Sequence, residues 1–199
     1  MDNILYVIGK HLYVNLTNRC PCACTFCIRN HTDTMGDSAS LWLKTEPAVE
    51  EVIRRFEACD LTQYEEVVFC GFGEPLERVD AVCEIARYLR GRSKIRIRIN
   101  TNGLANCIHG RDVTPELAGL IDIISISLNA SNAEEYLKVT RSKFGIQSFE
   151  KMLEFTRLAQ KYVPRVILSV VDIIGEAEIE KSREICKSTG AEFRVRQYE

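Results

Sequence analysis

The stretch Lys94-Ile-Arg-Ile-Arg-Ile-Asn-Thr-Asn-Gly103 contains the clearest strand signal of the chain, followed by a turn. Isoleucine alternates with polar residues as far as residue 100, and this period of two is typical of a strand that buries one face. Thr101-Asn-Gly103 is a turn signal. We therefore expect a strand at residues 94–100, with its isoleucines against helices and Arg96, Arg98 and Asn100 on the opposite face.

The same order of a β-branched run, a turn and a stretch with helical spacing recurs on both sides of this segment. Strands are expected at residues 12–17, 66–70, 94–100, 121–128, 166–172 and 191–197, and helices at 46–58, 79–89, 115–120, 133–139, 148–162 and 176–188. Thr45 is the expected N-cap of the first helix, with Pro47 in its first turn. This alternation indicates parallel βαβ units with right-handed crossovers.

A complete eight-fold barrel takes about 250 residues, and this chain has 199. The α/β pattern therefore favours a partial, open (β/α)6 barrel of the TIM type, formed by a single domain at 1–199. A doubly wound open sheet has the same periodicity and stays open as an alternative.

Composition restricts the classes of protein that the chain can belong to. Its hydrophobic fraction of 46% and charged fraction of 27% are those of a globular protein, and no apolar run is long enough to span a bilayer. A net charge of −2 gives no overall signal for nucleic-acid binding. No secretory signal is evident, so we expect a cytoplasmic protein whose nine cysteines serve metal binding rather than disulfides.

Four of these cysteines lie within eight residues, directly after the first expected strand, in Asn15-Leu-Thr-Asn-Arg-Cys-Pro-Cys-Ala-Cys-Thr-Phe-Cys-Ile-Arg-Asn30. Cys20, Cys24 and Cys27 have the spacing C-x3-C-x2-C, and three such thiolates can hold one face of an iron–sulfur cube. Three ligands for four irons leave one iron open for chemistry. Cys22 lies off this spacing, and a four-cysteine structural zinc site that includes it is the alternative.

Cys20, Cys24, Phe26 and Cys27 resemble the CxxxCxΦC signature of the radical SAM superfamily. The resemblance implies a [4Fe–4S] cluster on the three cysteines and S-adenosylmethionine (SAM) on the fourth iron. Residues 71–75, Gly-Phe-Gly-Glu-Pro, resemble the family's GGEP motif, which binds the SAM amino group, with Phe72 in place of a glycine. The resemblance covers nearly the whole chain, and is strongest to TatD-nuclease-associated radical SAM proteins, near the activase and 7-carboxy-7-deazaguanine synthase branches.

The resemblance also implies positions for the cofactor-binding residues, which are expected to be Phe26, Gly71, Phe72, Gly73, Glu74, Pro75, Asn102, Ser125, Ser127, Asn129 and Val171. The alternation of the strands predicts which residues face the substrate inside the barrel. These are Asn15, Arg96, Arg98, Asn100 and Arg196. Because an arginine fork matches carboxylate and phosphate, these residues predict an anionic substrate, although the arginines of the third and sixth strands could instead lie in water.

We therefore expect a radical SAM enzyme that cleaves SAM reductively to a 5′-deoxyadenosyl radical, which abstracts hydrogen from the substrate. Its cofactors would be a [4Fe–4S] cluster and SAM, and its partners an electron donor such as flavodoxin or ferredoxin and a small anionic molecule or a protein substrate. Neither a membrane nor a nucleic acid is an expected partner. The alternative is a non-catalytic module that binds structural zinc or an iron–sulfur cluster.

Overall fold

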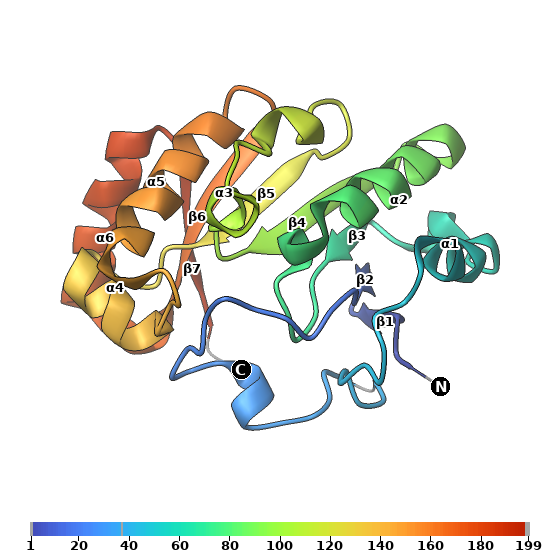
Figure 1. The fold of residues 1–199 in the computed structure, drawn as a ribbon, viewed down its shortest axis with the longest axis horizontal. Coiled ribbons are helices and arrows are strands. Elements are labelled where there is room, and N and C mark those ends of the chain that lie inside the picture. Colours follow the sequence, from blue (N-terminus) through green and yellow to red (C-terminus); the bar gives the residue numbers. More distant parts are fainter. Residues whose placement is uncertain (1, 37, 198–199) are drawn as a thin grey trace.

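The computed structural model describes residues 2–36 and 38–197, and in these residues seven strands form one sheet in the order β1-β2-β3-β4-β5-β6-β7 (Figure 1). The strands are β1 Leu5–Ile8, β2 His11–Val14, β3 Glu66–Phe69, β4 Arg96–Thr101, β5 Ile123–Ser127, β6 Arg165–Val171 and β7 Glu192–Arg196. β1 and β2 pair antiparallel, and every later pair is parallel. Because each strand lies beside its neighbours in sequence, the sheet winds in one direction, whereas a doubly wound sheet reverses.

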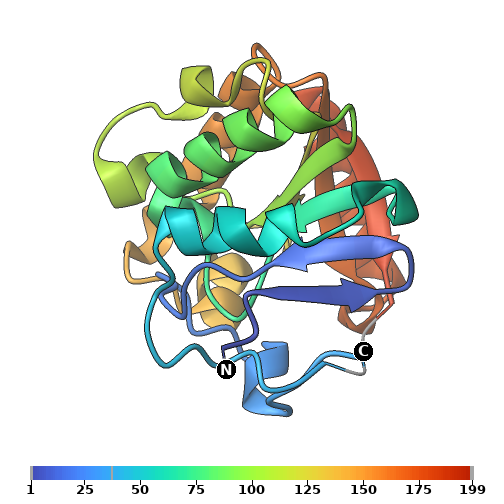
Figure 2. The ribbon, with the colours of Figure 1, turned by 90° about the vertical axis from the view of Figure 1, so that its right-hand side faces the viewer.

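Helices follow the parallel strands and cover one side of the sheet, as Figures 1 and 2 show from two directions. The α-helices are α1 Val49–Glu57, α2 Val79–Arg92, α3 Ala105–His109, α4 Ala133–Thr140, α5 Ser148–Ala159 and α6 Glu176–Thr189. Short 3₁₀ helices are η1 Ile28–Asn30, η2 Leu61–Gln63, η3 Pro75–Arg78, η4 Thr114–Leu117, η5 Gly145–Gln147 and η6 Asp172–Ile174. The α/β partial barrel expected from the sequence is confirmed. In the described part of the chain, no helix is long and apolar enough to cross a membrane.

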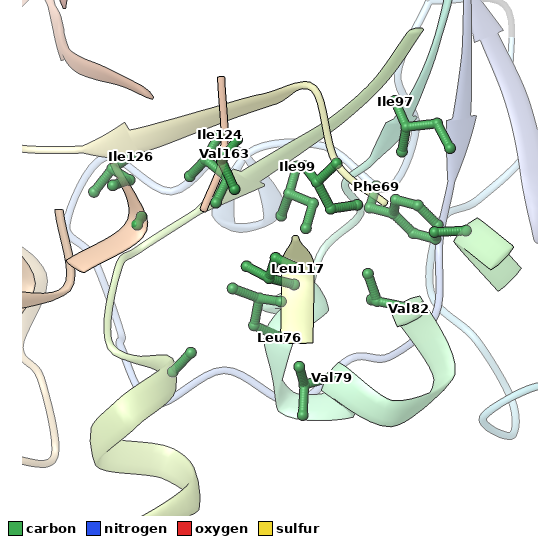
Figure 3. Close-up of a cluster of buried hydrophobic side chains, with 14 of the residues drawn as sticks. Phe69, Leu76, Val79, Val82, Ile97, Ile99, Leu117, Ile124, Ile126 and Val163 are labelled. Atoms are coloured by element: carbon green, nitrogen blue, oxygen red, sulfur yellow. The ribbon is translucent and has the colours of Figure 1, made fainter. Parts of the chain in front are cut away.

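The main hydrophobic core lies between the sheet and these helices (Figure 3). Ile97 and Ile99 of β4 are fully buried there, together with Val79 and Val82 of α2. The strand parity predicted from the alternation is therefore correct: isoleucines meet helices, and the polar residues of β4 lie on the other, concave face of the sheet.

A second apolar cluster joins the β1–β2 hairpin to the long segment between β2 and α1. Tyr6, Leu41 and Phe72 are its buried members. In Figure 1 this segment runs below the sheet, on the side where β3 leads into its loop. It therefore brings the cysteine-containing residues to the carboxyl end of the strands, where ligands bind in parallel α/β folds.

Several local predictions were wrong. Helix α3 was missed, and the helix expected at residues 115–120 is the 3₁₀ helix η4. The first strand of the sheet, β1, was missed, because a hairpin with no helix between its strands does not fit the βα pattern. The helix expected from residue 46 starts at Val49, with Ala48 rather than Thr45 as its N-cap. Glu46 instead hydrogen-bonds with Thr17 and Arg19 through its side chain. Glu46 also precedes Pro47, and helical backbone angles are disfavoured for a residue before proline.

Candidate active site

The cysteine loop follows β2 and lies at the rim of the sheet. Cys20, Cys24 and Cys27 are half-buried, whereas Cys22 is buried. Phe26 is half-buried beside Cys27, which forms the N-cap of η1. Cys22 belongs to the main hydrophobic core, and Cys20 and Cys24 pack against that core.

Hydrogen bonds and charge act on these thiols. A hydrogen bond with the Cys22 thiol lowers the pKa of Cys20 and that of Cys24, and raises the pKa of Cys22 itself. Burial raises the pKa of Cys27, and the nearby Arg29 guanidinium opposes this shift. Because the thiolate is the form that binds metal, Cys20 and Cys24 are prepared for ligation.

Arg29 also fixes the loop mechanically. Its Nη1 donates to the Phe72 carbonyl at 3.3 Å and its Nη2 to the Cys22 carbonyl at 3.1 Å. One guanidinium therefore joins the cysteine loop to the Gly71–Pro75 turn and brings positive charge to the thiols. Arg29 was not predicted from the sequence, because the direction of its side chain depends on the backbone of η1. The signal that could have indicated it is its position two residues after Cys27.

The donor set fits an iron–sulfur cluster. In residues 2–36 and 38–197, no three Cys, His, Asp or Glu side chains are arranged to hold a single metal ion. A four-iron cluster instead takes each cysteine on a different iron, so its ligands need not converge on one point. Cys20, Cys24 and Cys27, with Arg29 beside them, are the residues that would hold such a cluster.

The Gly71–Pro75 turn packs directly on the start of the cysteine loop. The Glu74 N–H donates to the Arg19 carbonyl at 2.7 Å. A Cβ on Gly73 would collide with the carbonyl oxygens of Thr17 and Arg19, and one on Gly71 would collide with the Asn15 side chain. These glycines are therefore required by close approach of the two loops. Phe72, where the motif has glycine, is buried and meets Trp42 edge-on at 5.1 Å between ring centroids.

Glu74 and Pro75 are both buried, and the Glu74 carboxylate connects the turn to the end of β4. It accepts from the Thr101 hydroxyl and the Asn102 N–H, each at 2.7 Å, and from the Leu76 N–H at 3.1 Å. Burial raises the pKa of Glu74 to about 8, negative charge on Cys20 adds to the shift, and the three hydrogen bonds oppose it. Thr101 was not predicted as part of the site, since it was taken only as the start of a turn.

Asn102 points to the cysteine loop. Its Nδ2 lies 3.8 Å from the Cys20 sulfur, while its Oδ1 accepts from the Leu104 N–H at 2.9 Å. Because Leu104 offers a donor, the oxygen of the amide is assigned to that side and the NH₂ group to the sulfur. Asn102, predicted as a cofactor residue, therefore contacts the thiol of Cys20, one of the three predicted cluster ligands.

The residues predicted around the ribose and adenine lie at the carboxyl ends of β5 and β6. Ser125 and Ser127 lie on the concave face of β5, and Val171 ends β6. Asn129 follows β5 with a left-handed φ of 62°, and its buried Oδ1 has no hydrogen-bond partner in the described residues. This orphaned acceptor at the rim suits a hydroxyl-bearing ligand.

The predicted substrate residues are only partly brought together. Asn15 is buried beside Gly71, and Asn100 hydrogen-bonds the Cys70 thiol on the concave face. Arg96 is exposed at the amino end of β4, about 17 Å from the rim at the usual rise of a strand. Arg96 therefore stays a predicted substrate residue, at the end of β4 away from the proposed cofactor site.

The charges of the concave face also differ from the expectation. Arg98 does face inward, but it pairs with Glu66 of β3 at 2.9 Å. Arg165 of β6 likewise pairs with Glu192 of β7 at 2.6 Å. Arg196 lies opposite Val171 and is exposed. The concave face is thus polar as predicted, but two of its arginines are neutralised by carboxylates that the single-strand patterns did not reveal.

Comparisons with known proteins agree with this geometry. Residues 14–185 match the model of the radical SAM superfamily. A GTP 3',8-cyclase of Corynebacterium glutamicum is 29% identical over 198 residues, which cover 94% of this chain and 48% of the cyclase. A probable dual-specificity RNA methyltransferase, RlmN, of Treponema pallidum is 33% identical over 123 residues, or 57% of this chain and 32% of the relative. The chain spans about half the length, or less, of these relatives.

Solved structures share the fold. Streptococcus suis SuiB bound to precursor peptide SuiA has a TM-score of 0.70 at 14% identity, over 98% of this chain and 40% of that one. Methylornithine synthase (PylB) has a TM-score of 0.65 at 13% identity, over 95% of this chain and 53% of that one. The chain belongs to the radical SAM superfamily, a class of enzymes that use a [4Fe–4S] cluster and SAM.

Proposed function

We propose that this chain cleaves SAM reductively at a [4Fe–4S] cluster held by Cys20, Cys24 and Cys27, and that it uses the product for hydrogen abstraction. When bound, the cluster and SAM supply a one-electron cleavage of the C–S bond to methionine and a 5′-deoxyadenosyl radical. The observation that carries the proposal is the direct contact of the cysteine loop with the Gly71–Pro75 turn, through Glu74 N–H to Arg19 C=O.

The chain's own residues would hold and orient these cofactors. Cys20, Cys24 and Cys27 bind three irons, and Gly71–Pro75 offers backbone acceptors to the SAM amino group. Ser125, Ser127 and Asn129 provide hydroxyl and amide groups for the ribose, and Val171 an apolar surface for the base. Phe26 lies beside Cys27 and would pack on the same ligand.

The substrate would bind on the concave face, next to the proposed SAM site. Asn15, Arg96, Arg98, Asn100 and Arg196 stay the proposed residues for recognising it, with Arg98 also paired to Glu66. Arg194 and Arg196 of β7 lie opposite Ser169 and Val171 of β6, at its carboxyl end. We assign recognition of an anionic substrate, small or part of a protein, to this part of the face, because a guanidinium matches carboxylate and phosphate.

The proposal also covers the domain, the subgroup, the electron donor and the compartment. Residues 1–199 form one radical SAM core domain, with the TatD-nuclease-associated group as the proposed subgroup. Flavodoxin or ferredoxin supplies the electron. The working compartment is the cytoplasm, a reducing environment that suits nine free cysteines.

The test is anaerobic reconstitution with iron and sulfide, followed by SAM and dithionite, with 5′-deoxyadenosine as the measured product. Cys24→Ala should lose cluster iron and product, whereas Cys186→Ala, a buried cysteine of α6, should retain both. A protein that binds stoichiometric zinc and no iron would contradict the proposal, as would an unimpaired Cys24→Ala variant.

A further inference from the structure

The outer surface of the cysteine loop is built together with the end of α4. The Ala23 N–H donates to the Thr140 carbonyl at 3.0 Å, and the Thr25 N–H to the Val139 carbonyl at 2.9 Å. The Lys143 N–H donates back to the Pro21 carbonyl at 2.9 Å. Residues 21–25 and 139–143 are therefore held side by side and present one continuous surface.

This surface carries unpaired positive charge. Arg141 and Lys143 are exposed, and neither has a carboxylate partner in the described part of the chain. Lys138, one turn earlier, pairs with Glu135 at 3.2 Å. The Ile146 side chain, three residues after Lys143, is 49% exposed. We name Ala23, Thr25, Arg141, Lys143 and Ile146 the outer patch; it combines two cations with apolar contact area.

The outer patch also flanks a proposed cluster ligand. Cys24 lies between Ala23 and Thr25, both of which are exposed. On its other side the loop packs against the Gly71–Pro75 turn, and Asn102 meets Cys20 there. A redox partner that docks on the outer patch therefore lies beside the residues that flank Cys24.

We propose that the outer patch is the docking surface for an acidic, low-potential, one-electron carrier protein of the flavodoxin or ferredoxin class. This inference rests on the proposed function. In the complex, one electron leaves the reduced carrier and converts the cluster from the 2+ to the 1+ state, and no covalent bond forms or breaks. Complementary charge steers such encounters and sets their register, while the exposed apolar side chain adds contact.

The test compares two double charge reversals in the reconstituted protein. Arg141→Glu with Lys143→Glu removes the positive charge of the outer patch. Arg54→Glu with Lys94→Glu makes the same change in net charge at two exposed residues of other elements, in α1 and just before β4. The probe is an acidic bacterial flavodoxin. Binding of its oxidised form is measured by calorimetry, and reduction of the cluster by its hydroquinone is followed in visible absorbance.

We expect the outer-patch variant to bind flavodoxin about tenfold more weakly and to slow cluster reduction by a similar factor, with less dependence on salt. The control variant should match the wild type, and dithionite should drive SAM cleavage equally in all three proteins. Equal binding by the wild type and the outer-patch variant would overturn the inference, as would equal weakening in the control. Retention of RNA instead of flavodoxin at the outer patch would overturn it too.

Failure of the proposed function gives a different result. If the wild type binds a cluster and dithionite yields no 5′-deoxyadenosine, the activity proposal fails, while flavodoxin affinity still reports on the outer patch. If cleavage proceeds with dithionite and flavodoxin ignores the outer patch, only the docking inference fails.

Discussion

At the scale of single residues, Gly73 is the most constrained position of the site. Its hydrogen faces the Thr17 and Arg19 carbonyls, so a methyl group has no room. We expect Gly73→Ala to lower the free energy of unfolding by about 1–3 kcal/mol, the usual cost of overpacking, and to weaken SAM binding. Urea unfolding and calorimetry with SAM measure the two effects.

Gly91 provides the matched control, because a Cβ there meets nothing within 4 Å in helix α2. Gly91→Ala should leave SAM binding unchanged and stabilise the protein by up to about 1 kcal/mol, since alanine is the better helix former. Equal stability changes in the two variants would show that the contact of the turn with the cysteine loop is not tight in solution.

Asn102 is the residue expected to adjust the cluster electronically. Hydrogen bonds to cluster sulfurs raise the reduction potential, and the Asn102 Nδ2 lies 3.8 Å from the Cys20 sulfur. Asn102→Asp replaces this donor with a carboxylate of the same size. We expect the midpoint potential of the bound cluster to fall by on the order of tens of millivolts, as measured by a redox titration followed with electron paramagnetic resonance.

Asn132→Asp is the control for added charge. Asn132 caps α4 by accepting from the Glu135 N–H, a role that aspartate fills equally well. In the Asn132→Asp protein, the midpoint potential of the cluster should stay at the wild-type value. A potential that is unchanged in Asn102→Asp, or shifted as far in Asn132→Asp, would remove Asn102 from this role.

At the scale of elements, β3 and β4 are joined on the concave face by Arg98 and Glu66, whose side chains are only 12% and 7% exposed. Removal of one partner from a buried pair leaves the other charge uncompensated. We expect Arg98→Met to lower the free energy of unfolding by about 3–5 kcal/mol. Because Glu66→Leu with Arg98→Met removes both charges, the double variant should be more stable than Arg98→Met alone.

A double-mutant cycle by urea denaturation separates these terms. If the losses of unfolding free energy in Arg98→Met and in Glu66→Leu add up to the loss in the double variant, the two residues act independently. Other groups of the concave face would then stabilise the charge of Arg98. The Arg165–Glu192 pair, at 44% and 53% side-chain exposure, is the comparison, and an exposed pair should contribute no more than about 1 kcal/mol.

Strands and helices were largely predictable because their signals are local. The alternation of β4 gave the correct buried face, and Gly190 ends α6 in the left-handed conformation expected of a C-terminal cap. Glu66 was not predicted as the partner of Arg98, because their meeting depends on the register of β3 against β4. The alternation within one strand predicts which side of the sheet a residue faces. It does not predict which residue of the neighbouring strand lies opposite.

At the scale of the whole molecule, the sequential strand order brings distant segments to one rim. The cysteine spacing located the proposed ligands from the sequence, since those residues lie within eight positions of one another. Their supports come from residues 72, 102 and 140, which no local pattern links to the cysteines. The cysteine motif could therefore be predicted from the sequence alone. The residues that surround the cysteines could be identified only from the folded structure.

Cluster binding should stabilise the whole protein, and the cysteine loop most of all. Hydrogen bonds of Ala23, Thr25 and Lys143 attach the cysteine loop to the end of α4 and to the residues after it. A ligand that binds the native state alone stabilises it by mass action, and most strongly where binding orders the chain. We expect cluster loading to raise the melting temperature and to slow amide hydrogen exchange at these three residues, with smaller changes in the interior of β5.

Removal of the cluster with a chelator should reverse both effects, and a Cys24→Ala protein taken through the same reconstitution should show neither. Because local opening exchanges loop amides without global unfolding, a uniform slowing across the sheet and the loop would point to global stabilisation only. Slowing confined to residues 20–30 and 139–143 would instead identify the contact of the cysteine loop with α4 as the segment that the cluster orders. In that case the outer patch is completed only in the loaded protein, and a carrier protein would distinguish loaded from empty enzyme by the order of this surface.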